Sequence, residues 1–363
     1  MYSKEIDNQF ELETGIVAKK DNTKMFKILL IIAGFIIIAL IITIIVLGVK
    51  YSSSKESSSQ KSYDNYFTSK VFMVKPVCFG FNEKTADTNS FQQEGFEKEA
   101  QEKALEESED FVKLLTENDI TVIQAKDTIN PKTPDSIFPN NWFSTHEDGT
   151  LVLYPMYAEN RRAERKQVFL EVIKNNFESK NIIDLTKWEN EGKFLEGTGS
   201  LVLDRENKIA YACKSPRTSE IVFNDFCKKL GYFPVLFNAV DKNDKMIYHT
   251  NVLMCIGKTY AIICLDSIKS TEEKNMIIES LTKSKKKIID ITLDQLEKFA
   301  GNMLEVKNKK GKRFLIMSET AYNSLTKEQK EYLENECTIL HPKIECIEIN
   351  GGGSARCMMA ELF

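Results

Sequence analysis

A repeating pattern of strands and helices constrains the fold of this 363-residue chain more than any other feature. Two apolar segments joined by a turn are followed by an amphipathic helix and a further apolar segment, and the pattern returns roughly every fifty residues. It occurs about five times if the opening segment 71–125 and the closing segment 344–363 together form one unit. Units of this size cannot bury their apolar faces alone, so they must pack against one another. The sequence therefore predicts a fivefold α/β propeller over residues 70–363.

The remaining units are complete within the chain. Their hairpins are predicted at 142–144 with 151–154, 200–203 with 209–212, 251–256 with 260–265, and 303–307 with 313–317. The helices are predicted near 160–178, 218–230, 271–283 and 326–336, and each precedes a further strand. Closure of a ring points the start of each hairpin at a shared centre. These starts carry polar and reactive residue types: Asn140-Asn141, Glu196 to Gly199, His249 to Asn251, Gly301-Asn302 and Arg356-Cys357.

An apolar segment near the N-terminus indicates a membrane anchor. Residues 28–49 are uncharged and lie between Lys27 and Lys50, and a helix of that length crosses a hydrocarbon layer of ~30 Å. We therefore expect a single-pass membrane protein with an N-terminal tail (1–27), a transmembrane helix (28–49), a Ser/Lys-rich linker (50–69) and a catalytic domain (70–363). Lysines flank the segment on both sides, so the side on which the domain lies stays open.

Charge and composition exclude several classes of function. A net charge of −4 argues against a nucleic-acid partner, which requires a clustered positive excess. The eight cysteines form no CxxC pair, and three histidines are too few to favour a histidine-built metal site. We therefore expect no metal and no other cofactor. The sequence leaves the oligomeric state open.

Three residues at the predicted hairpin starts suggest nucleophilic catalysis. Cys357 follows the glycines at 351–353 and begins the last repeat, where a thiol can be an activated nucleophile, although most cysteines are buried core residues. His249, in the segment YHTN, is the natural acid and base for such a thiol. Glu196, in LEGTG, can orient the imidazole through its second nitrogen.

Seven motifs of the chain resemble the guanidino-group-modifying, or pentein, enzymes, and most closely their arginine-deiminase-related branch that includes citrulline hydrolases. The motifs occur in family order: NNWFSTH (140–146), NRRAER (160–165), LEGTGSLVLDR (195–205), SPRT (215–218), HTN (249–251), GNMLEV (301–306) and GGGSARCM (351–358). The resemblance implies the fivefold propeller, with Cys357 as nucleophile, His249 as general acid and base, and Glu196 as the orienting carboxylate. It also implies that Arg161 and Arg217 hold the α-carboxylate of an amino-acid substrate.

Two departures from the family pattern point to the substrate. Arginine-type members place aspartates at the end of the NNWFSTH motif and two residues after the catalytic histidine, where this chain has His146 and Asn251. A guanidinium is a cation that only donates hydrogen bonds, so burying it without carboxylates is costly. A ureido group is neutral and carries a carbonyl acceptor. The resemblance and these residues therefore predict hydrolysis of citrulline to ornithine, carbon dioxide and ammonia, with Asn140, His146 and Asn251 around the substrate.

Two alternatives stay open at this point. The chain is an arginine deiminase or a dimethylarginine hydrolase if the family pattern outweighs the missing aspartates. It is a non-catalytic, membrane-tethered amino-acid-binding module if the cysteine is not used. The presence of Cys357, His249 and Glu196 together argues against the second alternative, because binding alone requires none of them.

Overall fold

The computed structural model describes residues 32, 43–44, 66–95 and 99–363 and divides the chain into two units, 1–64 and 65–363. Apart from Ile32, Thr43 and Ile44, which are helical, the predicted transmembrane segment 28–49 lies outside the described residues. Within the described ranges, no helix has the length and apolar character that crossing a membrane requires. All further description concerns the unit 65–363.

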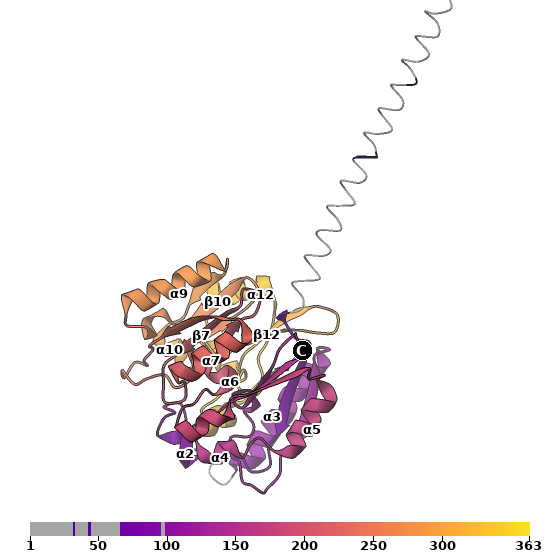
Figure 1. The fold of residues 1–363 in the computed structure, drawn as a ribbon, viewed down its shortest axis with the longest axis vertical. Helices are drawn as coiled ribbons and strands as arrows, with labels where there is room; N and C mark the ends of the chain where they lie inside the picture. The colour runs from indigo at the N-terminus through magenta and orange to yellow at the C-terminus, as the bar shows by residue number, and fades with distance from the viewer. Residues whose placement is uncertain (1–31, 33–42, 45–65, 96–98) are drawn as a thin grey trace, which may run out of the picture. The chain divides into compact units, whose positions relative to one another are not determined.

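Five three-stranded sheets make up this unit (Figure 1). In chain order their strands are β1 (Lys70–Lys75), β2 (Thr121–Lys126), β3 (Phe143–Thr145), β4 (Thr150–Leu153), β5 (Asn181–Asp184), β6 (Val202–Asp204), β7 (Ile209–Cys213), β8 (Phe233–Phe237), β9 (Met254–Ile256), β10 (Tyr260–Ile263), β11 (Lys287–Asp290), β12 (Leu304–Lys307), β13 (Arg313–Ile316), β14 (Thr338–Leu340) and β15 (Ala360–Leu362).

Every sheet has the same topology. Its central strand pairs antiparallel with one neighbour and parallel with the other, as β4 does with β3 and β5. The C-terminal strand β15 completes the first sheet by pairing antiparallel with β1, with Val71 opposite Glu361. The two ends of the domain are thus joined in one sheet, as predicted from the repeat count. The α/β pentein-type fold expected from the sequence is confirmed.

A helix connects the central strand of each sheet to its parallel neighbour, and the long helices lie at the periphery in Figure 1. The helices are α2 (Glu83–Ala86), α3 (Ala100–Glu117), α4 (Glu159–Arg162), α5 (Gln167–Asn176), α6 (Gly197–Ser200), α7 (Glu220–Leu230), α8 (Thr250–Leu253), α9 (Thr271–Lys283), α10 (Leu293–Leu296), α11 (Glu319–Ser324), α12 (Lys327–Glu336) and α13 (Glu345–Gly351), with 3-10 turns η2 (Pro139–Asn141), η3 (Thr186–Glu191) and η4 (Leu265–Ser267).

The apolar faces of these elements pack between neighbouring sheets. One buried cluster joins the sheet of β7 to that of β10, and a second joins the first and last sheets through residues such as Val71 and Phe314. Strands β3 and β15 contact each other, as do β6 and β9, and β9 and β12. The sheets therefore surround a common centre, at which the short helix α6 lies (Figure 1).

Two details of the predicted elements were wrong, and both concern the centre. Ser200 and Asn251, predicted as strand residues, belong to the one-turn helices α6 and α8. The hydroxyl of Thr250 donates to the carbonyl of Ser200 and so links these two turns. The predicted helix 160–178 is also broken, into α4 and α5. Each break in regular structure lies at a motif that carries polar residues toward the centre.

Candidate active site

Cys357 lies just after the glycine segment that ends helix α13. Gly352 is in the left-handed region, at φ 61°, and so turns the chain after the helix. The thiol is buried, and its Sγ accepts hydrogen bonds from the side-chain amides of Asn302 (3.2 Å) and Asn251 (3.4 Å). Donors aimed at a sulfur stabilise negative charge on it. The two asparagines therefore suit a cysteine that reacts as a thiolate.

His249 and Glu196 form a direct pair beside this thiol. His249 Nε2 lies 2.8 Å from Glu196 Oε2, and both side chains are buried. The other oxygen of Glu196 accepts the backbone N–H of Tyr157 at 3.0 Å. Because a carboxylate only accepts, the imidazole carries its proton on Nε2, and Nδ1 is left as the basic nitrogen.

Burial and neighbouring charges give this pair a defined protonation state. Burial by itself would raise the pKa of Glu196, but Arg217, the hydrogen bond of His249 and Arg161 outweigh it and lower the pKa to about 2. Burial lowers the pKa of His249 to about 4, against the attraction of Glu196. At neutral pH the pair is thus a carboxylate and a neutral imidazole that can accept one proton.

Two buried arginines flank the carboxylate of Glu196. Arg217 Nη1 lies 3.5 Å from its Oε2 and Arg161 Nη1 lies 3.8 Å from it. Arg161 is also held in a two-point pair by Glu164, at 2.8 and 3.0 Å. Arg217 donates to the carbonyl of Thr85 and to the hydroxyl of Thr88, beside helix α2. Both predicted carboxylate-binding arginines therefore lie at the same centre as the Cys357 thiol.

A small cavity opens onto these groups. It is lined by Asn89, Asp135, Phe138, Asn141, Arg161, Arg217, Tyr248, His249, Gly351, Gly352, Gly353 and Cys357. Among the residues described, Asp135 is the one carboxylate in this lining. Its Oδ2 accepts from Asn82 and Thr85 and lies 3.6 Å from Arg161, while its buried Oδ1 has no partner within the described part of the chain.

Asn141 supplies a hydrogen-bond donor to the cavity. Its Oδ1 accepts from Arg161 Nη1 at 3.0 Å, which fixes the amide because the guanidinium only donates. The amide nitrogen is buried and has no partner among the described residues. A Cβ added to Gly199 would clash with both this nitrogen and the His249 ring, so the two groups are neighbours. The site therefore presents an unused N–H donor beside the imidazole.

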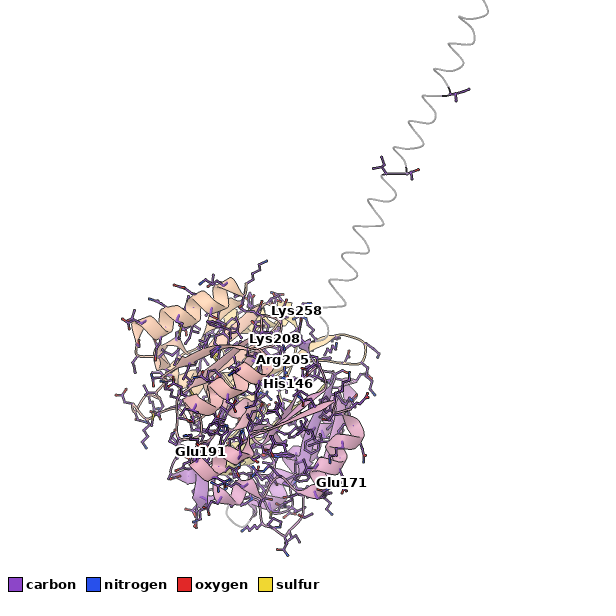
Figure 2. All side chains as sticks on the ribbon, in the orientation of Figure 1. His146, Glu171, Glu191, Arg205, Lys208 and Lys258 are labelled. Atoms are coloured by element: carbon purple, nitrogen blue, oxygen red, sulfur yellow. The ribbon has the colours of Figure 1, made fainter. Side chains whose placement is uncertain are left out.

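His146, which was predicted to bind substrate, is not among the residues that line this cavity. His146 follows strand β3 at the turn of its hairpin. Its ring nitrogens contact Ser144 (3.1 Å) and Arg205 (3.2 Å). Figure 2 shows His146 beside Arg205. Strand β3 extends away from the centre at ~3.3 Å per residue, so the end of the motif cannot reach the cavity. Asn140 is buried but is not among the cavity-lining residues. Asn251 contacts the thiol and lines a different pocket.

Sequence reasoning missed several residues of the site. Asn141 and Asn302 stood at predicted hairpin starts but were not selected, and Asp135 lies just before the first motif. The signal that could have identified these residues was their position at the centre of the ring, because residue type alone does not reveal that position. The segment that carries Thr85 and Thr88 had no sequence signal, because its contact with Arg217 joins residues far apart in the chain.

The motif LEGTG owes its two glycines to close packing. Gly197 has φ 47°, and a Cβ there would clash with the Asn140 carbonyl. A Cβ at Gly199 would lie 2.7 Å from His249 Nδ1. Helix α6 can therefore pass between the Asn140-Asn141 turn and the imidazole only if both positions lack side chains. This explains why the carboxylate of Glu196 and the base His249 meet.

The arrangement suits covalent catalysis by a thiol. Among the described residues, no group of three or more His, Cys, Asp or Glu side chains could hold a metal ion. The site combines a cysteine with two amide donors, a neutral base held by a carboxylate, and a cationic end with two arginines. Such a set can form and hydrolyse an adduct at a carbon bonded to nitrogen.

Comparison with known proteins places these residues in a family context. A family model described as "N,N dimethylarginine dimethylhydrolase, eukaryotic" matches residues 75–363, which include every catalytic candidate. A search of curated proteins found no match.

Solved structures of low sequence identity have the same fold. The N-terminal domain of ArgZ bound to substrate, a cyanobacterial arginine dihydrolase, superposes with TM-score 0.64 at 18% identity, covering 81% of this chain and 97% of that domain. The chain spans only 40% of the whole ArgZ chain. AgrE in complex with L-arginine gives TM-score 0.65 at 18% identity, covering 81% and 40%. A dimethylarginine hydrolase from Pseudomonas aeruginosa with citrulline gives 0.59 at 14%, covering 82% and 100%.

The packing of Gly199 can be tested directly. Gly199→Ala is expected to lower kcat by ~10²-fold or more, because the added methyl group displaces His249 by a distance that catalysis does not tolerate. Gly80→Ala is the matched control, since a Cβ at Gly80 meets nothing within 4 Å. Steady-state kinetics and thermal melting of both variants give the answer. Equal activity of the two variants would contradict the packing argument.

The neutral state of His249 predicts a pH-dependent stability. With a folded-state pKa of about 4 and an unfolded value near 6.5, the unfolded chain binds the extra proton as pH falls, so the wild type loses stability on acidification. His249→Gln keeps a donor for Glu196 but does not titrate. Between pH 7 and 5 the free energy of unfolding of the wild type is expected to fall by about 2 kcal/mol more than that of the variant.

Urea denaturation of both proteins at the two pH values measures this difference. Other titrating groups, such as Glu107 with its raised pKa of about 7, act on both proteins and cancel. Parallel pH curves would mean that folding does not lower the pKa of His249, and would contradict its assignment as a neutral base in a buried site.

Proposed function

We propose, since the chain belongs to the eukaryotic N,N-dimethylarginine dimethylhydrolase family, that this carbon–nitrogen hydrolase cleaves the ureido group of citrulline. The family membership makes the chain a cysteine hydrolase of the dimethylarginine dimethylhydrolase and arginine dihydrolase type. The choice of citrulline within that type is our inference from the cavity.

The unused N–H of Asn141 is the observation that supports citrulline as the substrate. A buried donor without a partner costs roughly 1–3 kcal/mol, so the bound substrate should supply an acceptor. The ureido group of citrulline has a carbonyl oxygen, whereas a guanidinium has donors only. The described carboxylate of the cavity, Asp135, is paired with Arg161 at 3.6 Å and lies within the cationic end. A guanidinium beside Cys357 would therefore lack a counter-charge there.

The cationic end fits the other half of an amino acid. Arg161 and Arg217 offer positive charge to the substrate α-carboxylate, and the unpaired Oδ1 of Asp135 offers an acceptor to its α-ammonium group. Burial raises the pKa of Asp135. The α-ammonium group of the substrate is expected to oppose this effect and keep Asp135 as a carboxylate. A zwitterionic head group thus has one charge for the two arginines and the opposite charge for Asp135.

The reaction proceeds in two steps at Cys357. The thiol adds to the ureido carbon and gives its proton to His249 Nδ1. The bond between the ureido carbon and its terminal nitrogen breaks, and this nitrogen takes the proton from the imidazolium, which Glu196 stabilises, and leaves as ammonia. Water then attacks the carbon bound to sulfur, the C–S bond breaks, and the thiol regains a proton. The carbamic acid product decomposes, so that one citrulline and one water give ornithine, carbon dioxide and ammonia.

Dimethylarginine hydrolysis is the second candidate, and the family match favours it. The Pseudomonas aeruginosa enzyme of that name was solved with citrulline bound, so a pocket of this fold accommodates the molecule. Arginine dihydrolases such as ArgZ share the fold as well. Against both cationic substrates stand the neutral Asn141, which lines the cavity together with Cys357, and the neutral amides of Asn251 and Asn302 that contact the sulfur.

We also propose that residues 28–49 anchor the enzyme in a membrane, on the strength of their composition. Fractionation of cells that express the whole chain or a chain without residues 28–49 tests this proposal. Only the first is expected in the membrane fraction.

The decisive test of function is a substrate panel. The full-length protein receives citrulline, arginine, dimethylarginine or agmatine, and the release of ammonia and ornithine is measured; citrulline is expected to give the largest kcat/KM. Cys357→Ala and Cys357→Ser serve as controls that should lose ~10³-fold or more in turnover without a change in melting. A preference for an arginine-type substrate would replace our choice with the second candidate. Binding of citrulline without any turnover would favour a binding module.

Asn141 provides the sharpest prediction for specificity. Asn141→Asp removes the N–H and places a negative charge opposite the ureido oxygen, so kcat/KM for citrulline is expected to fall by ~10²-fold or more. Asn141→Leu removes the donor without adding charge and should also harm citrulline turnover. Only the Asp variant should gain affinity for arginine, because only it supplies a counter-charge. Arginine affinity is measured by calorimetry, and an equal gain in both variants would contradict the argument.

A further inference from the structure

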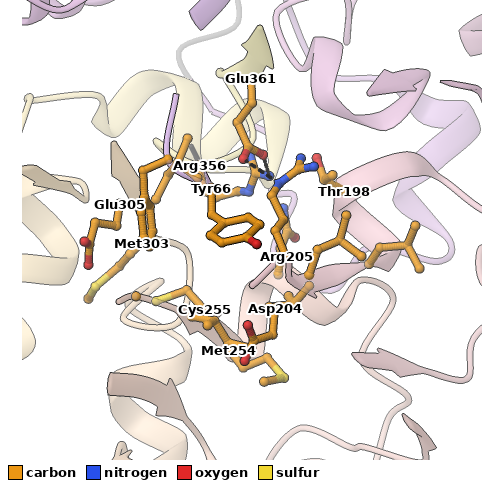
Figure 3. A pocket seen from close by; sticks show the side chains of 18 of the residues that line it. Tyr66, Thr198, Asp204, Arg205, Met254, Cys255, Met303, Glu305, Arg356 and Glu361 are labelled. Atoms are coloured by element: carbon orange, nitrogen blue, oxygen red, sulfur yellow. Dashed lines mark hydrogen bonds and ion pairs between the residues drawn. The ribbon is translucent and has the colours of Figure 1, made fainter. Parts of the chain in front are cut away.

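A second pocket lies next to Asn251 and Arg356, the first of which contacts the Cys357 thiol. It is bordered by strands β6, β9, β12 and β15 and by residues next to them in the chain, which contribute Arg205, Cys255, Glu305 and Glu361 among others, and by Tyr66. Figure 3 shows the Tyr66 ring projecting into this space, with Glu361 on one side and Cys255 on the other. We call it the rear pocket. None of its lining residues also lines the substrate cavity.

A thin polar wall separates the rear pocket from the thiol. Asn251 lines the rear pocket, and its Nδ2 contacts Cys357 Sγ at 3.4 Å. Arg356, the neighbour of Cys357 in the chain, lines the same pocket and is held there by Glu361 at 2.9 Å. Cys357 thus lines the substrate cavity directly, and the single side chain of Asn251 links its sulfur to the rear pocket.

Two buried polar atoms of the rear-pocket residues are unsatisfied. Asn251 Oδ1 and Arg205 Nη2 have no hydrogen-bond partner in the described part of the chain, although both side chains are at least nine-tenths buried. An acceptor and a donor of this kind suit a small molecule that both donates and accepts hydrogen bonds, such as water. The acceptor belongs to the residue that touches the nucleophile.

The second reaction step requires water while the substrate cavity is occupied. That cavity is small, and the amino-acid head group is expected to fill its cationic end until the product leaves. We propose that the rear pocket delivers the water that hydrolyses the adduct on Cys357, with Asn251 Oδ1 accepting a hydrogen bond from the incoming molecule. This inference rests on the proposed function only in that it requires a two-step reaction through Cys357.

The step balances without any further reactant. The water oxygen bonds to the carbon of the adduct, the C–S bond breaks, and one water proton passes to His249 Nδ1 and then to the sulfur. The other proton stays on the released carbamic acid. Delivery from the rear pocket therefore requires only that a neutral water molecule can pass the amide of Asn251.

Filling the rear pocket tests the proposal. Cys255→Phe adds a ring from strand β9, and Val202→Phe adds one from strand β6, which contributes another part of the lining. In rapid-quench experiments with the best substrate of the panel, intact-mass spectrometry follows formation and decay of the adduct on Cys357. Formation of the adduct is expected at the wild-type rate, while its decay slows at least ~10-fold, because only the second step consumes water.

Cys255→Ala and Tyr66→Ala are matched controls that enlarge the same pocket, and neither should slow the decay. Formation of the adduct reports that a variant is folded and binds substrate, so either Phe variant suffices. Decay at the wild-type rate in a variant that forms the adduct overturns the proposal. Slow decay in the Ala controls, or equal slowing of formation and decay in both Phe variants, overturns it as well. A wild type that forms no adduct refutes the two-step function itself, which is a separate result.

Discussion

The buried carboxylate of Glu196 is the interaction on which the rest of the site depends. It binds His249 at 2.8 Å and the Tyr157 amide at 3.0 Å, and it lies within 4 Å of two guanidinium groups. Without it, Arg217 would be a buried cation with no ion pair in the described part of the chain, which is strongly unfavourable, whereas Arg161 would keep its pairs with Glu164 and Asp135. The negative charge of Glu196 stabilises the buried arginines, and the same carboxylate fixes the tautomer of His249. Substrate binding and proton transfer are therefore coupled through one side chain.

Ring closure explains how residues so far apart in the chain meet at this carboxylate. Each sheet begins with a turn at the centre, and these turns carry Asn141, Glu196, His249 and Asn302 in successive units. The last unit contributes Cys357, and strand β15 then pairs with β1 to close the ring. Each turn precedes the edge strand that pairs antiparallel with the central strand of its sheet, so the packing of the sheets brings the polar groups to the centre, where they hydrogen-bond to one another.

The sequence predicts the architecture well, because its information is periodic. Helix 271–283 and most strands lie within one or two residues of their predicted bounds, and the repeat gave the centre at which Cys357, His249 and Glu196 meet. The prediction failed where a single residue mattered. His146 was assigned to the cavity by motif alignment, although β3 carries it away from the centre. Asp135, Thr85 and Thr88 depend on long-range packing that no local pattern encodes.

The polarity of the unsatisfied groups links the two sides of the nucleophile. On the substrate side Asn141 leaves a donor unused, and on the rear side Asn251 leaves an acceptor unused, while both asparagines are otherwise held by hydrogen bonds. Buried polar atoms without partners are rare in folded proteins, because each costs free energy that folding must offset elsewhere. Their opposite signs fit a carbonyl oxygen in front of the sulfur and a water proton behind it. An aspartate at either position would present acceptors only, which suits a guanidinium but not a carbonyl. The neutral side chains around Cys357 are therefore consistent with both the proposed substrate and the proposed direction of water attack.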